Sequence, residues 1–114
     1  MEDCIFCKIV SGEIKTDFLY EDDNFVVIND SNPATEGHCL VIPKKHYKTL
    51  FDLSVFLGNN LLEIAKAQGL RLIKEGKAEG IKLVQNNYEA SGQEVKHFHL
   101  HIIPEKKGVD TRHV

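Results

Sequence analysis

The sequence contains no tryptophan, one methionine and only three prolines among its 114 residues. Clustered charge of one sign is also missing: the formal net charge is -3, and no polybasic stretch occurs. Nucleic-acid backbones and anionic membranes are bound by clustered lysines and arginines, so we expect neither as a partner. A chain of this length folds without disulfide staples. We therefore expect one domain over residues 1–114 and a small-molecule partner.

Long hydrophobic runs are absent too. No apolar segment approaches the roughly 18 residues of a membrane span, and the first residues, MEDCIFCK, lack the basic and then apolar order of a signal peptide. We therefore expect a cytoplasmic protein. Because three cysteines in a reducing compartment rarely form structural disulfides, Cys4 and Cys7 are predicted to be metal ligands or a redox pair, and Cys39 a core side chain.

Local patterns predict an α+β domain. A short helix is expected over 4–11, before Gly12, and a long amphipathic helix over 53–76, although Gly58 and Gly69 weaken the second pattern. Strands that mostly neighbour each other in sequence, with one long helix between them, indicate an antiparallel sheet of about five strands. The expected strands are 18–21, 25–28, 39–42, 81–85 and 95–103.

Three of the six histidines lie at alternate positions of the stretch HFHLHII, residues 97–103. Side chains alternate between the faces of a strand, so His97, His99 and His101 are expected on one face and the apolar residues between them on the other. His97 and His101 cannot share one zinc ion, because residues four apart on a strand are separated by about 13 Å, whereas zinc–imidazole bonds measure about 2 Å. At least one histidine therefore has another task.

Nucleophilic catalysis is such a task. Imidazole has an ordinary pKa of about 6.5, so near neutral pH it is largely unprotonated and offers a lone pair. Its attack on phosphorus gives a phosphoimidazole that water hydrolyses readily, which divides a hard displacement into two easier ones. His99 suits this role because it has a histidine on each side. Its other ring nitrogen needs an acceptor, expected to be a backbone carbonyl, to fix the tautomer.

The triad and its surroundings resemble the histidine-triad (HIT) family of nucleotide hydrolases and transferases. The segments CIFCKIVSGEI, EDDNFVVIND, GHCLVIPKKHY and SGQEVKHFHLHIIP are similar to landmarks of that family, in order, from Cys4 to Pro104. The resemblance implies a homodimer that hydrolyses purine nucleoside phosphoramidates or dinucleoside polyphosphates through a covalent nucleotidyl-histidine. A nucleotide-binding adaptor with incidental catalysis is the alternative.

The resemblance also implies roles for individual positions. His99 takes the place of the nucleophile, and Asp30 that of the acid that accepts both ribose hydroxyls, which suits the two oxygens of a carboxylate. The other implied contacts are His38, His101 and Gln93 at the phosphate, Asn86 in support, and Ile5, Phe6 and Ile28 at the base. The last three are equally typical of ordinary core residues.

A bare C-x-x-C pair is compatible with redox chemistry, zinc or neither. Cys4 and Cys7 resemble the zinc-binding version of the family, in which His46 and His97 would complete the site. Two thiolates and two imidazoles form a closed tetrahedral zinc site, which is structural because it leaves no position open for water.

One position departs from the best-known branches of the family. Glu94 stands where those branches have a serine or threonine that contacts the phosphate or leaving group. Because a carboxylate repels a phosphate, the identity of the leaving group stays open.

A metal-dependent hydrolase that uses the triad as ligands is disfavoured by the spacing of the three histidines.

Overall fold

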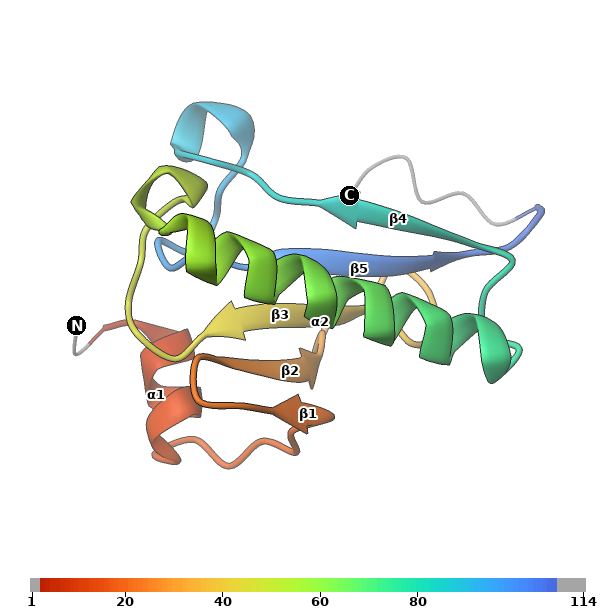
Figure 1. Ribbon diagram of the computed structural model, residues 1–114, viewed down its shortest axis with the longest axis horizontal. Helices are drawn as coiled ribbons and strands as arrows, with labels where there is room; N and C mark the ends of the chain where they lie inside the picture. The colour runs from red at the N-terminus through yellow and green to blue at the C-terminus, as the bar shows by residue number, and fades with distance from the viewer. Residues whose placement is uncertain (1–2, 109–114) are drawn as a thin grey trace.

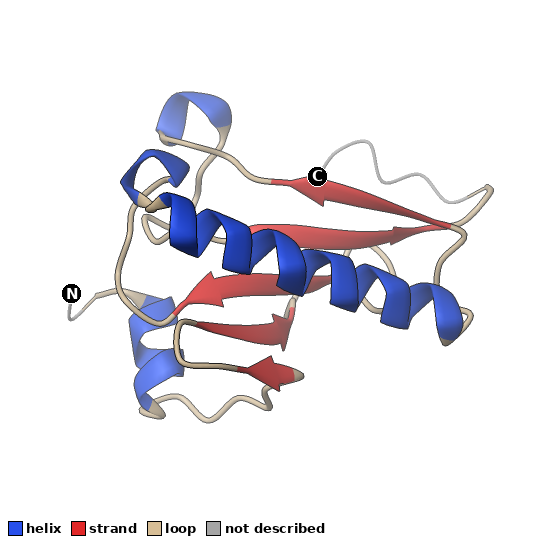
Figure 2. Cartoon of the chain, in the orientation of Figure 1, coloured by secondary structure: helices blue, strands red, loops and turns tan. Residues whose placement is uncertain are grey.

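The computed structural model describes residues 3–108, and it contains a five-stranded antiparallel sheet with a helix on each face (Figure 1). The α-helices are α1 (Ile5–Ser11) and α2 (Val55–Lys74), and the short 3-10 helices are η1 (Leu50–Asp52) and η2 (Glu89–Ser91). In the spatial order β1-β2-β3-β5-β4, the strands are β1 (Tyr20–Glu21), β2 (Phe25–Asn29), β3 (Cys39–Pro43), β5 (Leu100–Glu105) and β4 (Gly80–Val84). The predicted α+β fold, with one long and one short helix, is confirmed (Figure 2).

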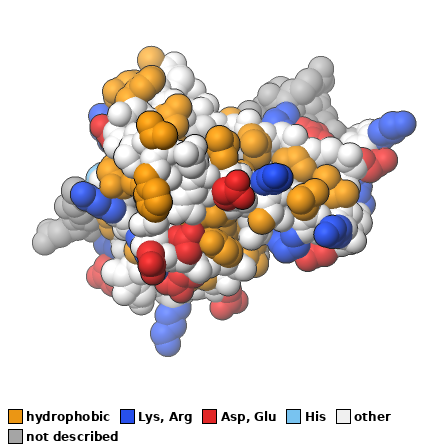
Figure 3. Space-filling view, in the orientation of Figure 1, with side chains coloured by type: hydrophobic (Ala, Val, Ile, Leu, Met, Phe, Trp, Pro, Cys, Tyr) orange, Lys and Arg blue, Asp and Glu red, His pale blue; other side chains and the backbone are white. Residues whose placement is uncertain are grey.

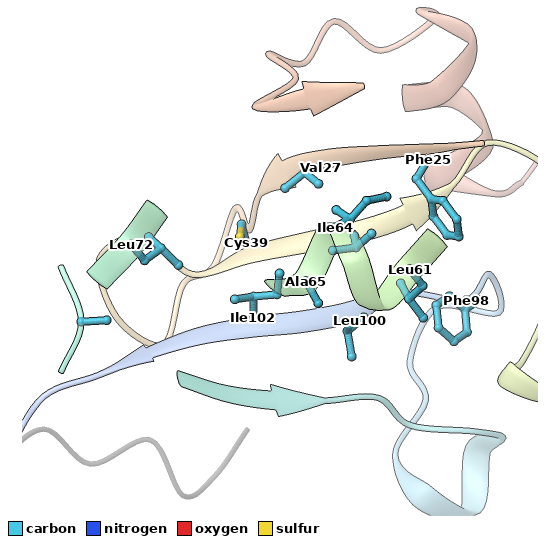
Figure 4. Packing of buried hydrophobic residues seen from close by; sticks show 12 residues of the cluster. Phe25, Val27, Cys39, Leu61, Ile64, Ala65, Leu72, Phe98, Leu100 and Ile102 are labelled. Atoms are coloured by element: carbon cyan, nitrogen blue, oxygen red, sulfur yellow. The ribbon is translucent and has the colours of Figure 1, made fainter. Parts of the chain in front are cut away.

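Both faces of the central strands are apolar, which explains why each face carries a helix. Alternate residues of β2 and β3 pack under α2, where Leu61, Ile64 and Leu72 complete the cluster that Figure 4 shows. The intervening residues pack instead under α1, against Phe6 and Ile9. The sheet is therefore the middle layer of three, with one hydrophobic cluster on each side.

The helix boundaries follow from local capping. The Cys4 sulfur accepts a hydrogen bond from the Cys7 N–H at 3.3 Å and caps α1, which ends at Gly12 in the left-handed conformation. Ser54 caps α2 in the same way, through the Leu57 N–H. The predicted range 53–76 was thus two residues too long at each end, and α2 is continuous through both of its glycines. Among the described residues, no helix is long and apolar enough to cross a bilayer.

The predicted strand 95–103 is wrong at its start, because β5 begins at Leu100 and leaves His97 and His99 ahead of it. The ladder between β3 and β5 stops at the pair Val41–Leu100, although β3 continues to Pro43, and β4 on the other side ends at Val84, opposite His101. Instead, the Phe98 N–H donates to the Tyr47 carbonyl at 2.6 Å. The predicted alternation of faces nevertheless holds, since Phe98 packs in the α2 cluster and the histidines lie on the α1 side. The sixth histidine, His113, lies outside the described residues.

Gly37, beside His38, is expected to be intolerant of a side chain. Its φ is +94°, and a Cβ atom there would lie 2.9 Å from Cδ2 of Leu72. We expect Gly37→Ala to lower the free energy of unfolding by about 2 kcal/mol, through backbone strain and overpacking. Gly12→Ala is the matched control, because Gly12 has a φ of +84° but open space around it. Urea unfolding measures both, and an equal loss in the two variants would contradict the steric contribution.

Candidate active site and metal centre

His99 lies on the α1 face of the sheet, between Phe6 and His101, with ring centroids 5.1 Å away in both cases. Its Nδ1 atom is 2.8 Å from the backbone carbonyl oxygen of His97. Because a carbonyl only accepts, Nδ1 of the neutral ring carries the proton and the lone pair is left on Nε2. The acceptor that the sequence predicted for this ring is therefore confirmed. The arrangement prepares Nε2 for attack on an electrophile.

A second group of side chains, Asp30, His38 and His101, fixes the tautomers beside His99. The Ala34 N–H donates to Nδ1 of His38 at 2.9 Å, so the proton of the neutral His38 ring lies on Nε2. That nitrogen lies 2.9 Å from Nδ1 of His101 and 3.3 Å from Oδ2 of Asp30. Since Nδ1 of His101 accepts from His38, the His101 proton lies on Nε2. Neutral His101 is thereby available as a hydrogen-bond donor.

Burial keeps both of these rings neutral. Removal from water lowers the pKa of His101 to about 4, and the neighbouring His99 and His38 act in the same direction, while Asp30 opposes them. Burial likewise lowers the pKa of His38 against the attraction of Asp30. Neutral rings have the defined donor and acceptor atoms described above.

The depressed pKa of His101 predicts that acid destabilises the fold. As the pH falls from about 6.5, the ordinary value, to about 4, the unfolded chain binds a proton that the folded chain resists. The contribution of this ring to stability is therefore complete above pH 6.5 and is lost within that window. Urea unfolding of the wild type and His101→Gln tests this, because groups that do not interact with His101 cancel in the difference. The difference between their free energies of unfolding should change between about pH 7 and pH 5. A constant difference would contradict the prediction.

The predicted metal ligands converge at the start of α1. One donor atom from each of Cys4, Cys7, His46 and His97 lies within 4.8 Å of the others. Nδ1 of His97 is 3.3 Å from the Cys4 sulfur, 3.5 Å from the Cys7 sulfur and 3.1 Å from Nδ1 of His46. A tetrahedral zinc site with ordinary bond lengths places such atoms about 3.3–3.8 Å apart. The donor set and its spacing therefore fit zinc.

His97 is fully buried and oriented for metal binding. Its Nε2 donates to the Pro43 carbonyl at 2.9 Å, which leaves the Nδ1 lone pair facing the cluster. Such an acceptor behind a ligand is typical of zinc-bound imidazoles. Burial, reinforced by Cys4, raises the pKa of the Cys7 thiol to about 11, so a cation is what would favour the thiolate here.

Gln93 occupies a position that the sequence did not predict. Its Nε2 donates to the carbonyls of Lys48 and Val95 at 2.6 and 3.1 Å, and its Oε1 accepts from the Tyr88 N–H at 2.6 Å. The side chain thus joins three backbone segments, one of which contains Tyr88 at a strained φ of 69°. Both amide hydrogens of Gln93 have backbone acceptors, and a contact of Gln93 with a phosphate stays a prediction.

The other predicted nucleotide contacts differ in accessibility. Ile5 is 47% exposed at the start of α1, whereas Phe6 is buried against His99 and Ile28 is buried in the α1-side cluster. Asn86 comes shortly after β4, and its side chain lies near Gly92. Its Nδ2 atom is 3.9 Å from the place that a Cβ atom on Gly92 would take. Their contacts with a base or phosphate stay predictions.

Comparison with known proteins agrees with this geometry. The HIT domain pattern matches residues 11–108. An uncharacterized HIT-like protein of Methanocaldococcus jannaschii is 40% identical over 105 residues, which cover 92% of this chain and 81% of that protein. Adenylylsulfatase HINT3 of Arabidopsis thaliana is 39% identical over 105 residues, or 92% of this chain and 53% of the plant protein.

A solved structure extends the likeness to three dimensions. The crystal structure of a Zn-bound histidine triad family protein from Mycobacterium smegmatis superposes with a TM-score of 0.89 at 34% identity. The alignment covers 97% of this chain and 82% of that one. Because the domain pattern spans most of the chain and relatives of this identity share its whole fold, the chain belongs to the HIT domain family.

Proposed function

We propose that the protein hydrolyses purine nucleotides at the α-phosphate through a covalent nucleotidyl-His99 intermediate. Nucleoside phosphoramidates and dinucleoside polyphosphates are the proposed substrates. The observation that supports this most directly is the hydrogen bond from Nδ1 of His99 to the His97 carbonyl, which leaves Nε2 as the nucleophilic atom. A relative named as an adenylylsulfatase is consistent with chemistry at a nucleotide phosphate.

The proposed reaction has two displacements. Nε2 of His99 first attacks the α-phosphorus and forms a P–N bond, while the bond from phosphorus to the leaving group breaks. Water then attacks the same phosphorus, the P–N bond breaks, and a nucleoside monophosphate is released. His101, with its proton on Nε2, would donate to the negative charge that develops on the phosphate. Asp30 would hold the ribose hydroxyls.

Trapping of the intermediate tests this function. Protein quenched in alkaline denaturant during turnover should have one nucleotidyl group on the peptide that contains His99, as detected by mass spectrometry. Full activity without such an adduct would overturn the mechanism. A panel of phosphoramidates, adenylylated amines and dinucleoside polyphosphates, ranked by kcat/KM, would then identify the leaving group.

We propose zinc as the resident ion of the Cys/His cluster. All four predicted ligands converge there, and a similar solved structure is described as Zn-bound. Closed to water, this ion would join the start of α1 to His46, in the loop after β3, and to His97, just before β5. Elemental analysis of protein purified without chelator should find about one zinc per chain. Cys39→Ala is the matched control and should retain it, since Cys39 lies in the α2-side cluster; a zinc-free protein would refute this assignment.

We also propose that the protein is a cytoplasmic homodimer. Figure 3 shows hydrophobic side chains gathered over α2, whose outward residues include Val55, Phe56 and Leu62 at 82%, 69% and 62% exposure. Such apolar side chains on an exposed helix face are typical of an interface between protein chains. The three cysteines are unpaired, which suits a reducing compartment. Light scattering at micromolar concentration should give the mass of two chains, and a monomer would refute the dimer.

A further inference from the structure

The buried residue His97 connects the Cys/His cluster to the proposed nucleophile, His99. Its imidazole Nδ1 faces Cys4, Cys7 and His46, while its backbone carbonyl accepts the Nδ1 proton of His99 at 2.8 Å. One residue therefore contributes its side chain to one site and its main chain to the other. Its side chain is also held from behind, at Nε2, by the Pro43 carbonyl. The position of the His97 backbone thus depends on what holds the His97 ring.

Helix α1 makes a second connection between the two sites. Cys4 and Cys7 bracket Phe6 in the first turn, and Cys4 is also the residue that caps this helix. The Phe6 ring contacts both His97 and His99 edge-on, with centroid distances of 5.8 and 5.1 Å. Ligation of the two cysteines would therefore also fix the aromatic side chain that packs against the nucleophile.

We propose that the Cys/His cluster positions the nucleophile, so that bound zinc fixes the tautomer and the ring placement of His99. This inference rests on the proposed function and on the proposed zinc. Cys4, Cys7, His46 and His97 are positioning residues in this view, because none of them reacts with the substrate. The zinc site is then coupled to catalysis as well as to folding.

The donor atoms of the cluster explain why a cation is needed. Nδ1 of His97 presents a lone pair, because the proton of that ring is donated to Pro43. Nδ1 of His46 lies only 3.1 Å from this lone pair, and the Cys7 sulfur is 3.3 Å from Nδ1 of His46. Thiols are weak hydrogen-bond donors. Without a cation, only weak contacts among the four groups would join His97, which the Pro43 carbonyl holds at Nε2, to His46 and the start of α1.

The variant Cys4→Ser separates ligation from helix capping. Serine is a good N-cap, so α1 should remain capped while a zinc ligand is lost. NMR of ¹⁵N-histidine-labelled protein should show the hydrogen-bonded Nδ1 proton of His99 in the zinc-loaded wild type, assigned by its absence in His99→Ala. We expect this signal to weaken or disappear in Cys4→Ser and to persist in the control Cys39→Ala. We also expect kcat to fall by about 10- to 100-fold in Cys4→Ser.

An unchanged His99 signal in folded, zinc-free Cys4→Ser would overturn the coupling. If that variant does not fold, cadmium-loaded wild type replaces it. The longer bonds of cadmium should shift the His99 ring resonances but not those of His38, and unshifted His99 resonances would equally overturn the proposal. Failure of the proposed function is distinguishable, because it would appear as the absence of a nucleotidyl-His99 adduct in the wild type, whatever the NMR spectra show.

Discussion

Replacement of His99 by alanine is expected to lower turnover by at least about a thousandfold. The variant loses the Nε2 atom that would bond to phosphorus, and neither neighbouring histidine is oriented to replace it. Nδ1 of His101 accepts from His38, and Nδ1 of His97 faces the Cys/His cluster. Binding of a nucleoside monophosphate and the zinc content should both be retained. Steady-state kinetics, calorimetric titration of the nucleotide and elemental analysis measure these three properties on one preparation.

The outcome also separates a nucleophile from a metal ligand. Unchanged turnover in His99→Ala would eliminate the covalent mechanism. Loss of zinc together with turnover would instead indicate that His99, and not only His97, is a ligand.

Replacement of His97 by alanine is expected to have a different signature, in zinc content and stability. The variant should lose its zinc and about 3–5 kcal/mol of unfolding free energy. The causes are a cavity at a fully buried position, an unpaired carbonyl at Pro43 and an incomplete ligand set. Urea unfolding and zinc analysis, done alongside His99→Ala, provide the measurement.

The comparison of the two variants is informative because the residues are neighbours of the same type. His99 is 9% exposed and has no counterpart to the metal-facing nitrogen of His97, so its removal should cost much less stability. Equal losses of stability, or retention of zinc in His97→Ala, would contradict the proposal that His97 is a zinc ligand and His99 the nucleophile.

The sequence predicts much of this fold because its patterns are local. The alternation of histidines and apolar residues predicted that Phe98, Leu100 and Ile102 share one face, and all three lie in the α2-side cluster. It did not predict that β5 begins at Leu100, since the β3 ladder stops at Val41 and the Phe98 N–H bonds instead to the carbonyl of Tyr47, in the loop after β3. Hydrogen-bond partners this far apart in sequence leave no periodic signal.

The candidate site was predictable to a similar extent. Residue types and the family resemblance predicted the ligands and the nucleophile, and the structure brings the four predicted ligands Cys4, Cys7, His46 and His97 together. The relay from Ala34 through His38 to His101 was missed, because a backbone donor has no sequence signature. The same holds for the amide of Gln93, whose partners are all backbone atoms.

The strand order has a consequence for synthesis of the protein on the ribosome. The last strand of the described chain, β5, lies between β3 and β4, although both are made before it. A nascent chain that stops before Leu100 therefore contains the sheet β1-β2-β3 and an unpaired β4, without the strand that joins them, and it also lacks His101. Hydrophobic closure and completion of the catalytic centre should then occur together, late in translation, so that truncated chains are both unstable and inactive.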